Sequence, residues 1–428
     1  MRWPIPLRVG NNSPIVIQQL FFVLVQFLFH TGFLIHNHSV SGKYVNRHNR
    51  INCHDKEPPG LLRLRESDGT FGLGSGFQGL NFCPHFAHII PGNRGNTRES
   101  AGIRKAAQPC SRKAKRLFST GRKIKVHKLG AFLPHDTSGD VAQLHGIGLQ
   151  KFGDTWYAYG ENKVNGNLFQ GVCCYTTTDF IAWRSHGIVL DVQEDGSALA
   201  ADRIGERPKV LHCPATGKYV MYIHAETPDY GYAHIGVAVA DAPTGPFAFQ
   251  TTITWRGYLS RDIGVFQDED GSGYIMSEDR DHGTHIYRLA DDYLTIVEDV
   301  ACERATDYPY GLESPTIIKK DGLYYWFGSQ LTSWDTNDNK YSTATDLHGP
   351  WSEWKLFAPE GAKTYDSQVD IVVPLDDDPY NSEHFLFIGD RWQEHDLGNS
   401  PIVQMPISIA DGVASLTWSD TYEGTTHR

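Results

Sequence analysis

The sequence is poor in cysteine, and most of its length is poor in positive charge. Its 428 residues include seven Cys, an odd number, without any Cys-x-x-Cys spacing, so neither a full disulfide framework nor a zinc site is expected. Residues 131–428 carry 19 Lys and Arg against 45 Asp and Glu. Phosphate binding requires a basic face, so this acidic part excludes nucleic acid or an anionic membrane as its main partner.

Long apolar runs are also scarce, since residues 14–35 form the only one. This run is long enough to cross a bilayer, follows Arg2 and Arg8, and has no small-x-small cleavage site after it. It predicts an uncleaved signal-anchor, hence a secreted protein or one anchored in the secretory pathway, with no other membrane contact. The alternative is that the run is not native coding sequence.

Residues 1–130 differ from the rest of the chain, with 20 Lys and Arg against 5 Asp and Glu. Residues 36–128 show neither helical nor strand periodicity. Gly74–Gly79 matches a dinucleotide-binding pattern without the flanking strand and helix, and 112–128 is a basic run typical of a solvated tail. We expect 1–130 to be a largely irregular linker or disordered segment, and 131–428 to be a separate folded domain.

The acidic part repeats itself five times. A turn followed by an aromatic strand recurs every 50–63 residues, and a strand ending in Ala-Asp or Thr-Asp recurs every 50–65 residues. The aromatic strands begin at Trp156, Tyr219, Tyr274, Tyr324 and Phe385, and the acidic ends are Asp179, Asp241, Asp291, Asp346 and Asp411. Two independent markers therefore share one rhythm.

Each repeat has room for about four short strands, and helical periodicity is almost absent. A four-stranded antiparallel unit repeated radially is a propeller blade. The sequence therefore predicts an all-β, five-bladed β-propeller over 131–428, with functional residues at one mouth of its central channel.

Polar residues follow or open the inner strands where apolar residues would continue a core. They are Glu161, Glu206, Asp262, Glu313 and Gln368. Converging carboxylates beside Trp and Tyr suit glycoside hydrolysis, in which one acid protonates the leaving oxygen and aromatic rings stack on sugars.

The motifs around these residues resemble glycoside hydrolase family 43. Ser-Arg-Asp262-Ile-Gly and Glu313-Ser-Pro-Thr carry the resemblance to the family, while Tyr-Gly-Glu161-Asn-Lys, Glu206-Arg-Pro-Lys and Tyr-Asp-Ser-Gln368 resemble its exo-β-1,3-galactanase branch. The resemblance implies a five-bladed, inverting glycosidase that releases galactose from the non-reducing end of β-1,3-galactan, the arabinogalactan backbone. It implies galactan or arabinogalactan as the partner. We expect no cofactor and no metal.

The resemblance also implies roles for individual residues. Glu313 is the general acid, and Asp262 tunes and orients it. The residues expected to contact the terminal sugar are Glu161, Glu206, Tyr230, Glu303, Thr332 and Trp334. The family's usual base, an Asp on the first inner strand, is missing from Gln143-Leu-His-Gly-Ile-Gly148. We expect Gln368 to hold the attacking water, and either Glu206 or an imidic-acid tautomer of Gln368 to take its proton.

Other functions stay open from the sequence. An α-L-arabinofuranosidase or β-xylosidase of the same family is the nearest alternative, and a non-catalytic sugar-binding propeller is another. Asp268–Gly273 imitates a calcium loop, but we interpret it as a hairpin turn because amphipathic helices do not flank it.

Overall fold

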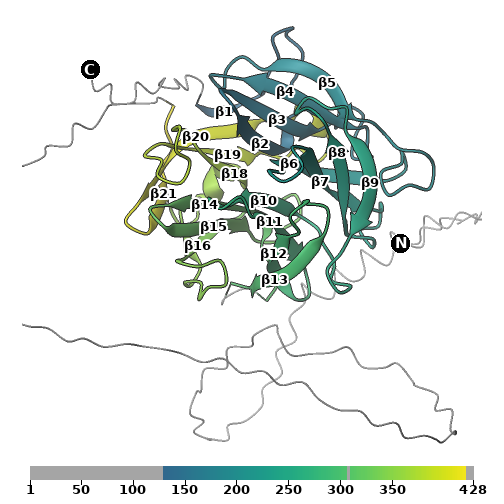
Figure 1. Ribbon diagram of the computed structural model, residues 1–428. Helices are drawn as coiled ribbons and strands as arrows, with labels where there is room; N and C mark the ends of the chain where they lie inside the picture. The colour runs from purple at the N-terminus through teal and green to yellow at the C-terminus, as the bar shows by residue number, and fades with distance from the viewer. Residues whose placement is uncertain (1–128, 306–308, 421–428) are drawn as a thin grey trace, which may run out of the picture. The chain divides into compact units, whose positions relative to one another are not determined.

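The computed structural model describes residues 129–305 and 309–420, which fold into five antiparallel sheets arranged around a centre (Figure 1). The signal-anchor expected at 14–35, the glycine pattern at 74–79 and the basic run at 112–128 lie outside the described residues, so their predictions stay predictions.

Four of the sheets consist of four consecutive strands each. The first contains β2 (His145–Phe152), β3 (Thr155–Glu161), β4 (Val172–Thr177) and β5 (Arg184–Leu190). The second contains β6 (Ile204–His212), β7 (Tyr219–Glu226), β8 (His234–Ala240) and β9 (Ala248–Ile253). The third contains β10 (Ile263–Gln267), β11 (Gly273–Asp279), β12 (Gly283–Leu289) and β13 (Ile296–Glu303). The fourth contains β14 (Glu313–Lys320), β15 (Leu323–Ser329), β16 (Lys340–Ala344) and β17 (Lys355–Leu356).

The fifth sheet joins the two ends of the propeller. It contains β18 (Gln368–Pro374), β19 (Phe385–Asp390), β20 (Ile402–Ala410) and β21 (Val413–Leu416). Strand β1 (Gly130–Phe132) pairs antiparallel with β20, with Ala131 opposite Val403. The ring is therefore closed by strand pairing between the start and the end of the domain.

The predicted repeat is confirmed at both markers. The five aromatic residues lie in the second strand of each sheet, β3, β7, β11, β15 and β19. The five Asp residues follow the third strands, β4, β8, β12, β16 and β20.

The hydrophobic core lies between neighbouring sheets. Each of five buried clusters combines side chains of two adjacent blades, such as Leu149 of β2 with Ile371 of β18. The first strands contact one another in turn, β2 with β6, then β10, β14, β18 and β2 again. The core thus fixes the relative positions of five strands whose ends form the site.

The loop that imitates a calcium site is part of a hairpin. Asp268 lies in the β10–β11 hairpin, where its carboxylate accepts hydrogen bonds from Lys319 Nζ at 2.8 Å and from the Tyr324 hydroxyl at 2.5 Å. Both of its oxygens therefore bind other side chains of the propeller.

Among residues 129–305 and 309–420, none of the helices has the length and apolar character needed to cross a membrane.

Candidate active site

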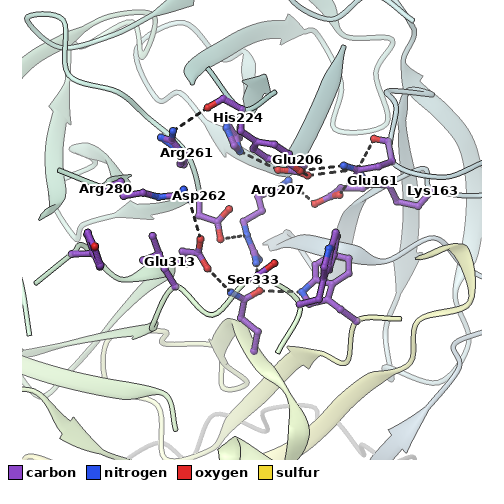
Figure 2. Close-up of a pocket in the computed structure, with 17 residues that line it drawn as sticks. Glu161, Lys163, Glu206, Arg207, His224, Arg261, Asp262, Arg280, Glu313 and Ser333 are labelled. Carbon is purple, nitrogen blue, oxygen red and sulfur yellow. Dashed lines mark hydrogen bonds and ion pairs between the residues drawn. The ribbon is translucent and has the colours of Figure 1, made fainter. Parts of the chain in front are cut away.

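A polar pocket of about 590 Å³ opens where the inner strands end (Figure 2). This volume suits a small ligand such as one or two sugar rings. The lining residues are Glu161, Lys163, Asn167, Glu206, Arg207, His224, Tyr230, Arg261, Asp262, Arg280, Tyr310, Glu313, Leu331, Ser333, Trp334, Gln368 and Trp392.

The structure brings together seven of the nine residues that the sequence analysis named. Glu313, Asp262, Gln368, Glu206, Glu161, Tyr230 and Trp334 all line the pocket. Glu303 ends β13 and is not among the described lining residues. Thr332 is also absent from the lining, because its hydroxyl bonds to the Asp335 carbonyl within its own loop, and Leu331 and Ser333 on either side line the pocket instead.

The first strands of three blades have a β-bulge at the end that faces the pocket. The ladder is interrupted by a bulge just after His145, Glu206 and Glu313. The next residues, Gly146, Arg207 and Ser314, have φ of 56°, 49° and 52°. A bulge of this kind bends the strand and re-aims its side chains.

Each bulge is held by a carboxylate of the preceding blade. Gly146 N–H donates to Asp390 at 3.0 Å, Arg207 N–H to Glu161 at 2.8 Å, and Ser314 N–H to Asp262 at 3.0 Å. Asp262 therefore positions Glu313 through the backbone of the next residue.

The Glu313 carboxyl group is 18% exposed and lies among other acids. Burial, then the charges of Asp262 and Glu278, raises the pKa of Glu313 well above its ordinary value, although Arg207 and Arg280 oppose the shift. Arg280 Nη2 is 3.8 Å from Glu313 Oε1. This environment favours a protonated carboxyl group, the form that a general acid needs.

Arg207 links the carboxylates at the centre of the pocket. Its guanidinium lies 2.6 Å from Asp262 and 3.0 Å from Asp370, and it donates to Gln368 Oε1 at 2.5 Å. Lys209 Nζ is also 3.0 Å from Asp370. Two buried cations thus offset the acids beneath the pocket.

The amide group of Gln368 has four hydrogen-bond partners. Its oxygen accepts from Arg207 and from Trp392 Nε1 at 3.0 Å. Its nitrogen donates to Ser329 Oγ at 2.8 Å and to Glu313 Oε2 at 3.5 Å. Guanidinium and indole N–H groups can only donate, so they fix which end of the amide is oxygen.

Glu161 and Glu206 lie on another side of the pocket with Lys163. Lys163 Nζ is 3.2 Å from Glu161 and 3.9 Å from Glu206. Burial raises the pKa of Glu161. Burial acts in the same direction on Glu206, but hydrogen bonds from His224 and Tyr230 and the charge of Lys163 outweigh it and lower the pKa of Glu206 to about 2.

Glu206, His224 and Asp262 form the cluster closest to a metal-binding geometry, with ligand atoms within 4.8 Å of one another. These atoms already have partners, since Arg207 is 2.6 Å from Asp262 and both ring nitrogens of His224 face carboxylates. This donor set fits an ion-pair network and does not fit a cation.

Sequence reasoning missed several lining residues, among them Arg207, His224, Arg280 and Trp392. Arg207 follows Glu206 directly and Trp392 follows β19, so their places in the repeat could have indicated them. His224 carries no such signal, because it lies inside the apolar-looking strand Tyr219–Glu226.

Comparisons with known proteins identify the family of the chain. The sequence profile of Glycosyl hydrolases family 43 matches residues 149–361. A solved Bifidobacterium bifidum s17 protein, provisionally described as an exo-β-1,3-galactanase, is 99% identical, with a TM-score of 0.68, over 70% of this chain and 100% of that chain. An exo-β-1,3-galactanase from Phanerochaete chrysosporium, solved with galactose, is 31% identical, with a TM-score of 0.64, over 68% of this chain and 67% of that one.

A curated relative has a different described activity. It is Xylosidase/arabinosidase 43A from Humicola insolens, 39% identical over 89 residues. The match covers 20% of this chain and spans 27% of that protein.

Proposed function

The chain belongs to glycosyl hydrolase family 43, in its exo-β-1,3-galactanase branch, and on that premise we propose that it releases galactose from the non-reducing end of β-1,3-galactan with inversion. The observation that carries the proposal is the partly buried Glu313, whose pKa is raised in a pocket lined by further carboxylates and aromatic rings. A binding protein without catalysis has no use for a carboxyl group held in this form. The chain is therefore a glycosidase.

Glu313 acts as the general acid in this proposal. It gives its proton to the glycosidic oxygen as the bond from that oxygen to the anomeric carbon breaks, and it is left as a carboxylate. Arg207 and Arg280 then lie near the new negative charge. Water adds to the opposite face of the anomeric carbon, which inverts its configuration.

Gln368 is proposed to hold that water. In the structure its nitrogen is only 3.5 Å from Glu313, whereas the two groups of an inverting pair stand roughly 6.5–9.5 Å apart. The contact with Glu313 is the longest of the four that Gln368 makes, so it is the one that an entering sugar ring can replace. The freed N–H can then bind the water.

Glu206 is favoured over an imidic-acid tautomer as the acceptor of the water's proton. The tautomer would place a proton on the Gln368 oxygen, where Arg207 and Trp392 already donate and no acceptor is offered. A carboxylate with a pKa of about 2, such as Glu206, is a weak base. It suffices, because a water bonded to the anomeric carbon is a much stronger acid than any carboxyl group.

The terminal galactose is proposed to lie against Glu161, Glu206 and Tyr230, with Trp334 as an aromatic wall. Tyr230 and Glu206 are hydrogen-bonded at 2.9 Å, which presents two polar groups to sugar hydroxyls. Trp334 packs edge-on against Trp392 at 5.9 Å between ring centroids. The relatives solved with galactose and with β-1,3-galactotriose support this choice of substrate.

The test is to incubate the full chain with β-1,3-galactobiose, and separately with aryl arabinofuranoside and aryl xyloside, and to follow early products by proton NMR. We expect galactose from galactobiose, released first as the α-anomer. Initial β-galactose would mean a covalent intermediate and would overturn the roles of Gln368 and Glu206. Faster cleavage of the arabinoside or xyloside would mean that the chain is a xylosidase or arabinosidase, the activity described for the curated relative.

We further propose that residues 14–35 direct the enzyme to the secretory pathway or anchor it there. The support is the sequence alone, an apolar run preceded by Arg2 and Arg8. Fractionation of the native host with an antibody to the propeller tests this. Enzyme found only in the cytosol would contradict it.

A further inference from the structure

Two titratable side chains on one strand have no part in the proposed mechanism: His224, which lines the pocket, and Glu226, which does not. His224 and Glu226 are on β7, two residues apart and therefore on one face of the sheet. They are 1% and 0% exposed. Glu206 is directly opposite His224 on β6.

The imidazole ring joins two carboxylates. His224 Nδ1 is 3.2 Å from Glu206 Oε2, and Nε2 is 3.3 Å from Glu226 Oε2. A neutral imidazole has one N–H, so one ring nitrogen would turn a lone pair toward a carboxylate. Nε2 is hydrogen-bonded to Glu226, whereas Nδ1 makes an ion-pair contact with Glu206 that lacks hydrogen-bond geometry. Only the imidazolium form presents an N–H and a positive charge to both carboxylates.

The surroundings of His224 favour that charged form. Besides Glu206 and Glu226, it experiences the charge of Asp262, and the Tyr230 ring lies 6.5 Å away. Burial by itself would lower the pKa of His224, but its contacts with Glu206 and Glu226 outweigh burial and raise the pKa to about 9.

The second oxygen of Glu226 organises the loop after β7. Glu226 Oε1 accepts from the backbone N–H groups of Thr227, Tyr232 and Ala233 at 2.8, 2.7 and 2.9 Å. This loop contains Tyr230, whose φ is 55° and whose hydroxyl donates to Glu206 Oε1. Glu226 thus supports both groups that bind Glu206 from this side, His224 and Tyr230.

We propose that His224 and Glu226 are positioning residues for sugar binding: His224, as an imidazolium, links Glu226 to Glu206, and Glu226 holds the loop that brings Tyr230 to the same carboxylate. Glu206 is thereby kept ionised and fixed in place as an acceptor for a hydroxyl of the terminal galactose. The proposal rests on the proposed function for the identity of that sugar.

The sign of the pH dependence follows from the raised pKa of His224. The link is intact below pH 9 and is lost as the pH rises through about 9, when the ring becomes neutral. Galactose should then bind more weakly, although Glu206 itself remains charged.

The experiment measures galactose affinity by calorimetry between pH 6 and pH 10. Glu313→Gln serves as the background, so that titration of the acid does not contribute. We expect constant affinity up to about pH 8.5 and a fall above it. His224→Gln should bind galactose about ten- to hundredfold more weakly at neutral pH, the range for losing one hydrogen bond to a charged group, without the fall near pH 9.

His285→Gln is the matched control. His285 is also buried and faces a carboxylate, Asp299 at 3.2 Å, but it lies on β12 and does not line the pocket. It should leave both the affinity and its pH dependence unchanged. Equal affinity and the same alkaline fall in His224→Gln and its parent would overturn the proposal.

A second measurement covers the case in which His224→Gln does not fold. Nitrogen-15 NMR of the wild-type chain labelled at histidine should show one ring that titrates near pH 9 and that shifts in Glu226→Gln. Absence of any histidine titrating above pH 8 would refute the imidazolium link. This titration needs no ligand, so it distinguishes failure of the link from failure of the wild-type enzyme to bind galactose, which would refute the proposed function.

Discussion

Replacing Asp262 by Asn separates the charge of this residue from its hydrogen bonds. One oxygen of Asp262 accepts a hydrogen bond from the Ser314 N–H at 3.0 Å and makes an ion-pair contact with Arg207 Nε at 2.6 Å. The amide oxygen of Asn can take that position and keep both contacts. The substitution therefore removes a negative charge near Glu313 while leaving the bulge that aims Glu313 in place.

Removing the charge of Asp262 lowers the pKa of Glu313 in two ways. Asp262 is a cause of the raised pKa of Glu313, and Arg207 lowers that pKa. Without Asp262 the first influence is lost, and Arg207 acts with one fewer carboxylate beside it. The pKa of Glu313 should therefore fall towards its ordinary value.

The assay is the pH profile of kcat/KM on β-1,3-galactobiose, whose leaving group needs a proton. We expect the alkaline limb of Asp262→Asn to move to lower pH, with activity at low pH reduced much less. Asp262→Ala should add a loss at every pH, because it also removes the acceptor for Ser314.

Asp268→Asn is the matched control. Asp268 is about as exposed as Asp262, 13% against 14%, and also pairs with a cation, Lys319 at 2.8 Å, but it lies in a hairpin away from the pocket. Its alkaline limb should match that of the wild type. An unmoved limb in Asp262→Asn would refute the assignment of Asp262 as the residue that tunes the acid.

Four further outcomes are expected. Glu313→Gln should lower turnover of galactobiose by about 10²–10⁴, and much less on aryl galactosides with acidic leaving groups; equal losses would remove Glu313 from the acid role. Trp392→Phe, which keeps a ring but removes one donor to Gln368, should lower kcat about tenfold with little change in KM; an unchanged kcat would mean that this hydrogen bond does not matter. A chain that begins near residue 125 should unfold cooperatively and stay active, whereas one that begins at 134 lacks β1 and should lose stability in urea; equal midpoints would show that β1 is dispensable. Ser314→Gly should raise the free energy of unfolding by about 1 kcal/mol and lower kcat; a destabilised variant would contradict the strain inferred at Ser314.

The blades could be predicted from the sequence because the repeating residues occupy the same structural position in every blade. An aromatic residue such as Trp156 packs against the neighbouring sheet at the start of each second strand, and an Asp such as Asp241 follows each third strand. These positions recur because every blade meets the same neighbours. The closure by β1 was not foreseen, since a three-residue strand leaves no periodic pattern.

The pocket was harder to predict because its contacts join residues far apart in the chain. Arg207 bonds to Gln368, 161 residues later, and Gly146 to Asp390, 244 residues later. Residue type and motif could indicate Glu313 or Gln368 one at a time. Which amide atom faces Trp392, and which carboxylate keeps its charge, depends on the closed ring and on the partners that it brings together.

The bulges explain why catalytic side chains stand where the ladder breaks. In a regular strand, Glu313 and Ser314 would point to opposite faces of the sheet. The left-handed conformation of Ser314 changes the direction of the Glu313 side chain, and the Ser314 N–H donates to Asp262. Ser314 is an L-residue at φ of 52°, and its buried hydroxyl lacks a hydrogen-bond partner in the structure. Each of these features costs about 1–3 kcal/mol of stability. Glycine would relieve both, but it would loosen the backbone on which Glu313 stands. The blade thus retains a strained residue where a stable one would position the acid less firmly.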